Sequence, residues 1–162
     1  MNETEMRLHR CCFTGHRPEK LIWAEEKVIA WLESEIRKAV NDGFVTFISG
    51  MARGVDIWAA EIVLRLRNEG LPIHLICASP FEGFERSWNE DWKRRYSDVI
   101  QRADLLKYIC KGYSRYCFQI RNEWMVDRST LVIAVFDGQP GGTMNTINYA
   151  KKNNIRVISI EN

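Results

Sequence analysis

Apolar residues recur every three or four positions in several long stretches of this chain, with short β-prone runs between them. In residues 24–42, Val28, Leu32, Ile36 and Val40 fall on one face of a helix. Similar patterns, ended by glycine, proline or charged residues, predict four further helices over residues 55–69, 86–101, about 118–128 and 142–153.

Six short runs between and around these helices have the character of β-strands. Residues 130–136 are almost entirely apolar, which is typical of a strand covered on both faces. The other predicted strands are residues 10–14, 44–49, 73–78, 105–109 and 155–160. The alternation predicts an α/β fold, a Rossmann-like three-layer sandwich with a mainly parallel sheet of about six strands. The length of 162 residues favours a single domain over residues 1–162.

Three glycine-containing loops follow predicted strands, and right-handed crossovers place all such loops at one edge of the sheet. Ligands bind at that edge in folds of this kind. The candidate ligand-binding residues in these loops are Thr14, Gly15, His16, Arg17, Ser49, Gly50, Met51, Ala52, Arg53, Gly54, Asp56, Gly141, Gly142 and Thr143.

The residue types in these loops suit a phosphate group. Glycines let the backbone present its N–H groups to a ligand, and a following helix adds its positive end. Arg17 and Arg53 would supply charge-assisted hydrogen bonds, and Thr14, Ser49 and Thr143 would add hydroxyl donors. Plain turn chemistry is the structural alternative. Because the GxGxxG and Gly-Lys-Ser/Thr motifs are absent, NAD enzymes and P-loop NTPases are disfavoured.

Several side chains allow both a functional and a structural interpretation. His16 is a candidate general acid or phosphate ligand, or a hydrogen-bonding loop residue. Asp56 could bond a ribose hydroxyl, orient Arg53, or stabilise the start of a helix. Trp88 and Trp92, one turn apart on a predicted helix, could stack on a base, although core packing is favoured for such a spacing.

Composition narrows the function classes. The net charge of +2 comes from 23 basic and 21 acidic residues, which argues against nucleic acid as a partner. The five cysteines lack metal-site spacing, so no metal site is expected, and reduced thiols favour a cytoplasmic protein. The polar residues 1–10 do not resemble a signal peptide, and no apolar run approaches the roughly 18 residues that span a membrane.

Three motifs resemble a known superfamily. Residues 49–60 resemble the SGxARGxD…AA motif of the DNA-processing protein DprA (Smf). Residues 121–125 and 140–143 resemble the RxxxM and PGGxGT motifs of LOG proteins, which are cytokinin-activating phosphoribohydrolases. Both groups belong to the SLOG superfamily, and residues 12–18 are similar to a small bacterial SLOG family typified by YpsA. This resemblance covers residues from about 10 to 160 and implies a Rossmann-like fold with a nucleotide-derived ligand.

The chain departs from the LOG pattern at a position that matters for catalysis. LOG enzymes have glutamates after PGGxGT, whereas Ile147 or Asn148 stands at the expected acidic position here. Arg121 matches the LOG arginine, but its acidic partner is missing. The acids that could substitute are Asp56, Asp127 and Asp137. The DprA motif also differs, with Glu61 where DprA usually has histidine.

These observations leave three hypotheses of function. The first is a nucleotide-binding sensor or regulatory domain, with nucleoside phosphates, NAD and ADP-ribose as candidate ligands. The second is a LOG-like phosphoribohydrolase or other nucleotide hydrolase, with Arg121 and His16 as candidate catalytic residues. The third is DprA-like binding of single-stranded DNA, which the lack of a strongly basic stripe disfavours. The resemblance also leaves a homo-oligomer open, because SLOG relatives often pair.

Overall fold

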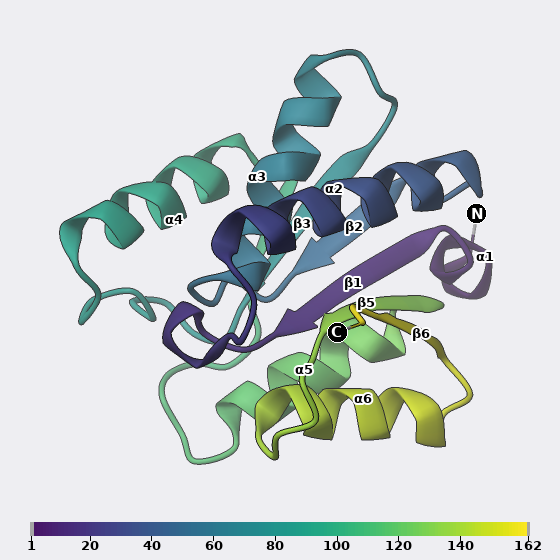
Figure 1. Ribbon diagram of the computed structural model, residues 1–162. Helices are drawn as coiled ribbons and strands as arrows, with labels where there is room; N and C mark the ends of the chain where they lie inside the picture. The colour runs from purple at the N-terminus through teal and green to yellow at the C-terminus, as the bar shows by residue number, and fades with distance from the viewer. Residues whose placement is uncertain (1, 162) are drawn as a thin grey trace.

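A computed structural model describes residues 2–161 and shows a six-stranded parallel sheet flanked by helices (Figure 1). The strand order is β4-β3-β2-β1-β5-β6, and every neighbouring pair is parallel. The predicted Rossmann-like α/β fold is therefore confirmed. The strands are β1 (Arg10–Gly15), β2 (Thr46–Ser49), β3 (His74–Ser79), β4 (Leu105–Tyr108), β5 (Leu131–Val135) and β6 (Arg156–Ser159).

Helices cover both faces of this sheet. Helices α2, α3 and α4 pack side by side on one face, and α5 and α6 pack together on the other (Figure 1). The apolar stripe predicted for α2 is buried at Val28, Leu32 and Ile36. No helix within residues 2–161 is both long enough and apolar enough to cross a membrane. The long helices are α2 (Glu25–Asn41), α3 (Val55–Asn68), α4 (Glu90–Arg102), α5 (Cys117–Asp127) and α6 (Gly142–Lys152).

Two short helices differ from the sequence prediction, and so does one helix boundary by more than one residue. The pattern did not predict α1 (Glu3–Arg7) or the 3₁₀ helix η1 (Pro18–Lys20). The predicted start of α4 at residue 86 is wrong, because Asn89 caps the helix and its side chain accepts a hydrogen bond from the backbone N–H of Trp92. Trp88 therefore precedes α4 and does not share a helical face with Trp92.

The chain changes direction across the sheet between β1 and β5. Strands β2, β3 and β4 are added successively on one side of β1, and the chain then returns to place β5 on the other side. Thr14 pairs with Ala134 and Gly15 with Val135, so β1 and β5 end together. The loops that follow them lead to helices on opposite faces, which opens a crevice at this point.

Close packing at the end of β1 fixes the position of α3. A Cβ atom built at Gly15 would lie 2.5 Å from Cγ2 of Val55, the first residue of α3. Only a residue without a side chain fits there, and so the first turn of α3 lies directly against the crevice.

Replacing Gly15 with alanine is therefore expected to lower the free energy of unfolding by about 1–3 kcal/mol, because the added methyl group overpacks this contact. Urea denaturation measures the change. Gly112→Ala is the matched control, since nothing lies within 4 Å of a Cβ atom there, and it should change stability by less than about 0.5 kcal/mol. Equal effects of the two substitutions would contradict the packing argument.

Candidate functional site

An open cleft of about 710 Å³ lies at the carboxyl ends of β1 and β5. All three loops predicted from the sequence reach it, together with α5 and the segment before α4. The predicted residues that line it are Thr14, Gly15, His16, Arg17, Ala52, Arg53, Asp56, Arg121, Gly141, Gly142 and Thr143.

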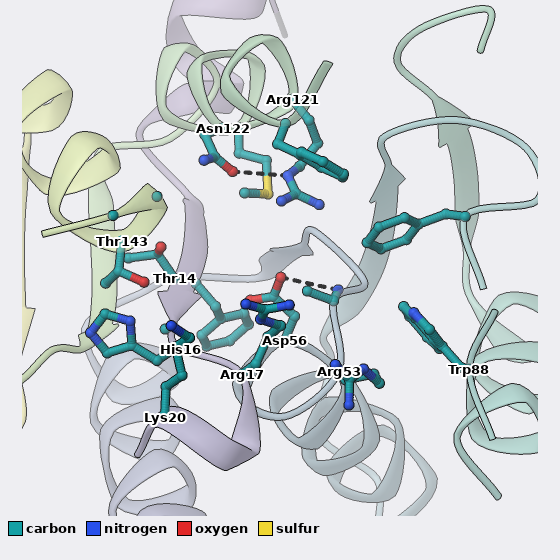
Figure 2. A pocket seen from close by; sticks show the side chains of 18 of the residues that line it. Thr14, His16, Arg17, Lys20, Arg53, Asp56, Trp88, Arg121, Asn122 and Thr143 are labelled. Carbon is teal, nitrogen blue, oxygen red and sulfur yellow. Dashed lines mark hydrogen bonds between the residues drawn. The ribbon is translucent and has the colours of Figure 1, made fainter. Parts of the chain in front are cut away.

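The third loop places the start of α6 at one side of the cleft. Gly141 has a φ of +143°, a conformation that favours glycine, and α6 begins at the next residue. Within residues 2–161, no side chain caps the first N–H groups of α6. Thr143 and Thr14 lie nearby (Figure 2). Free amide groups, a helix dipole and hydroxyl groups together suit an anion.

The second loop is held largely by its own hydrogen bonds. The Ser49 hydroxyl donates to the Asp56 carbonyl at 2.8 Å and accepts from the Met51 N–H at 3.2 Å. Met51 and Gly54 have φ values of 66° and 89°, which give the loop its tight shape. Ser49, Gly50, Met51 and Gly54 are thus placed behind the cleft lining and shape the loop; their contact with a ligand stays a prediction.

Asp56 is a nearly buried carboxylate at the floor of the cleft, with 6% of its surface exposed. Its Oδ2 accepts a hydrogen bond from the Ala52 N–H at 3.2 Å, while Oδ1 is buried and has no partner among the described residues (Figure 2). Burial raises the pKa of Asp56 to about 6, although Arg121 and the Ala52 N–H act in the opposite direction. The interpretation that Asp56 orients Arg53 is wrong, because Arg53 pairs with Glu19.

Arg121 lies beside Asp56 and is equally buried. Its Nη1 donates to the Gly50 carbonyl, and its Nε donates to the Asn122 Oδ1 at 2.8 Å. A Cβ atom at Gly50 would lie 2.9 Å from Oδ2 of Asp56 and 3.1 Å from Cδ of Arg121, so this glycine lets the two groups approach. Burial lowers the pKa of Arg121, and the nearby Asp56 opposes that shift. The fold thus places a carboxylate next to the arginine for which the sequence showed no partner.

The other two candidate acids have different surroundings. Asp137 follows β5, and its Oδ1 lies 3.2 Å from Nε2 of His16, with 2% and 9% of the two side chains exposed. Asp137 thus lies beside a histidine that lines the cleft, although His16 Nε2 makes no hydrogen bond among the described residues. Asp127 is exposed and accepts a hydrogen bond from the Tyr149 hydroxyl at 2.6 Å, and it does not line the cleft. Asp56 is thus the candidate acid whose own side chain faces the site.

Aromatic side chains line the cleft on the side opposite Thr143 (Figure 2). Phe84 packs edge-on against Trp88 at 5.0 Å between ring centroids, and Phe118 lies 5.6 Å from Phe84. Trp92 instead packs against Trp58 at 6.2 Å and does not line the cleft. Phe118 was not predicted as a site residue, because α5 brings it to the cleft from a segment far from Trp88 in the chain.

Basic side chains lie at the mouth of the cleft. Arg17 and Lys20 come from η1 and its flank, and Arg53 comes from the second loop. Lys20 was not predicted, because the short turn that brings it to the cleft leaves no periodic signal. Among residues 2–161, no cluster of three or more histidine, cysteine or acidic residues could hold a metal ion.

Asp56→Asn is expected to stabilise the protein at neutral pH. Because the pKa is raised from 3.8 to about 6 on folding, the folded chain holds a proton that the unfolded chain releases between pH 4 and 6. Stability therefore falls as the pH rises through this window, and the charged form costs about 3 kcal/mol above it. Urea denaturation should show the variant more stable at pH 7.5 by about 1–3 kcal/mol, and equal to the wild type at pH 4. An equal advantage at both pH values would rule out burial of the charge as the cause.

Comparisons with known proteins place the chain in a family. The YpsA family, described as the YspA SLOG family, matches residues 11–161. The chain is 35% identical over 140 residues to the SPbeta prophage-derived protein YoqJ of Bacillus subtilis, covering 79% of this chain and 80% of YoqJ. It is 30% identical over 139 residues to the UPF0398 protein OB1025 of Oceanobacillus iheyensis, covering 80% and 75% of the two chains.

A solved structure shares the fold. DNA processing protein A from Helicobacter pylori, whose single-stranded DNA binding mode has been described, superposes with a TM-score of 0.66 at 21% identity. The match covers 99% of this chain and 68% of that protein. The profile match, the two relatives and the sheet topology agree, and the chain belongs to the YpsA family of the SLOG superfamily.

Proposed function

We propose that the cleft binds a nucleotide or a nucleotide-derived phosphate ligand, and that the protein acts as a sensor or regulatory domain. The observation that carries this proposal is that one side of the cleft suits an anion and the other side is aromatic. The start of α6 lies on one side and the aromatic side chains lie on the other. A nucleotide has the same division between phosphate and base.

The phosphate is assigned to the α6 side. The uncapped N–H groups at Gly142 and Thr143 point an array of donors and the positive end of the helix dipole toward an anion. Thr14 and His16, from the neighbouring strand end, lie on the same side (Figure 2). A phosphate at this position would receive hydrogen bonds from two separate loops. Because a phosphate has several acceptor oxygens, it can use both sets of donors at once.

The base is assigned to the aromatic side. Trp88 and Phe84 line the cleft, and stacking on aromatic rings contributes about 1–3 kcal/mol per base. Asp56 lines the cleft between the two sides, where its carboxylate could accept a hydrogen bond from a sugar hydroxyl. The cleft volume of about 710 Å³ falls within the range of small-molecule and cofactor sites.

Trp88→Leu is expected to weaken nucleotide binding about tenfold, because it removes the stacking surface. Isothermal titration calorimetry with adenosine 5′-monophosphate, NAD and ADP-ribose measures the change. Trp92→Leu is the matched control: it lies four positions away and outside the cleft, so it should leave the dissociation constant unaltered while thermal stability falls. A wild-type protein that binds none of these ligands at millimolar concentration would refute nucleotide binding.

Hydrolysis of a nucleotide is a second candidate function, favoured by the position of Asp56. Cleavage of an N-glycosidic bond develops positive charge on the sugar, and a nearby carboxylate stabilises it. Asp56 lines the cleft beside Arg121, and its Oδ1 is unpartnered. It could therefore take the part of the glutamate that this chain lacks after Thr143.

Release of free base from nucleoside monophosphates, followed by chromatography, tests this candidate. Asp56→Asn should lower the rate at least about 100-fold, as expected for loss of a catalytic carboxylate, while calorimetry shows that the ligand still binds. Base release that persists in this variant, or its absence from the wild type, would exclude Asp56 from such a role.

Single-stranded DNA is a third candidate occupant. The Helicobacter pylori neighbour is described as binding it. Exposed Tyr113 and Tyr116 lie in the loop before α5, where Lys111 and Arg115 supply positive charge. The small net charge of +2 gives this candidate less support than a small nucleotide.

A further inference from the structure

A glutamate of the chain itself pairs with two of the arginines at the cleft. Oε1 of Glu19 lies 3.0 Å from Nη2 of Arg53 and 3.8 Å from Nε of Arg17. Glu19 is half-exposed and borders the cleft through the two arginines, both of which line it. One carboxylate oxygen therefore occupies the space where the two guanidinium groups converge.

The fold holds this arrangement from two directions. Glu19 lies on η1, which follows β1, and Arg53 lies on the loop after β2. These segments are in close contact, because a Cβ atom at Gly54 would lie 2.9 Å from Cδ of Pro18. Backbone packing therefore brings the segments that carry the two arginines together, so both side chains can reach one point.

The Glu19 carboxylate shows that the space accepts an oxyanion. Its pKa is lowered by its own backbone N–H, and also by Arg53 and Arg17, so it is anionic at neutral pH. A carboxylate oxygen and a phosphate oxygen accept the same charge-assisted hydrogen bonds from guanidinium groups. Because the ion pair is exposed to solvent, it is weak enough for a ligand to displace.

We propose that Arg17 and Arg53 form a second anion subsite at the rim of the cleft, which Glu19 occupies until a ligand displaces it. The first subsite is the start of α6, on the opposite wall from Arg53 (Figure 2). The preferred ligand is then a nucleotide that carries an anionic group beyond its first phosphate. This inference rests on the proposed nucleotide binding and narrows the ligand to that class.

The test compares three ligands by calorimetry at one fixed, low ionic strength. Adenosine 5′-monophosphate has one phosphate, ADP has two adjacent phosphates, and adenosine 3′,5′-bisphosphate has two separated ones. For each protein, the measured quantity is the affinity for a two-phosphate ligand divided by the affinity for the monophosphate. This ratio cancels general effects of charge and stability on nucleotide binding.

Glu19→Gln should raise the ratio about threefold, because the Glu19 carboxylate no longer competes with the ligand for the two arginines. This size corresponds to the loss of one exposed ion pair. Arg53→Gln should lower it by up to about tenfold, because a charge-assisted hydrogen bond to the second anion is lost. Glu26→Gln is the matched control, because it removes the same charge from an exposed residue outside the cleft. It should leave the ratio at the wild-type value. Thermal melts confirm that each variant folds.

The outcomes separate this inference from the proposed function. A response for ADP alone identifies an adjacent second phosphate, and a response for the 3′,5′-bisphosphate alone identifies a separated one; either supports the subsite. If the wild type binds the monophosphate but the ratio is the same in all variants, the second subsite is refuted and nucleotide binding stands. If the wild type binds none of the three, both proposals fail for adenine nucleotides.

Discussion

The contact between the end of β1 and the start of α3 determines much of the cleft. Gly15 has no side chain, and Val55 fills the space that one would need. The next residue along α3, Asp56, is thereby fixed at the floor of the crevice, where Ala52 and Arg121 are its polar neighbours. A packing requirement between apolar groups thus sets the position of a nearly buried carboxylate at the floor of the site.

The negative charge of Asp56 lowers the stability of the folded protein, because burial disfavours the ionised carboxylate. Asp56 and Arg121 are both removed from water, and they compensate one another only in part, because Oδ1 of Asp56 has no partner among the described residues. An amide or an apolar pair would be more stable in such a place. Sites that retain a destabilising ionisable group are commonly sites of function, since binding or chemistry can use the group that folding disfavours.

The sequence was informative where local patterns decide the structure. The stripe on α2 and the apolar run of β5 predicted their elements closely, and the handedness of crossovers predicted that the three loops would meet. The start of α4 was predicted wrongly because the spacing of Trp88 and Trp92 outweighed the cap at Asn89. The proximity of Asp56 to Arg121 could not be predicted, because only the tertiary fold brings together two residues so distant in the chain. Ser49 shows the remaining ambiguity, since a hydroxyl that closes a loop looks the same in sequence as one that meets a ligand.

The position of β5 beside β1 also has a consequence for how the protein forms. Strands β1 to β4 assemble by successive crossovers, whereas β5 begins at residue 131 and must pair with a strand that ended at residue 15. Closing so long a segment costs more chain entropy than each successive crossover, so we expect this junction to form after the others. The cleft straddles the same junction. A ligand that contacts both of its sides would therefore stabilise the junction between the two parts of the sheet, because it binds only the folded arrangement.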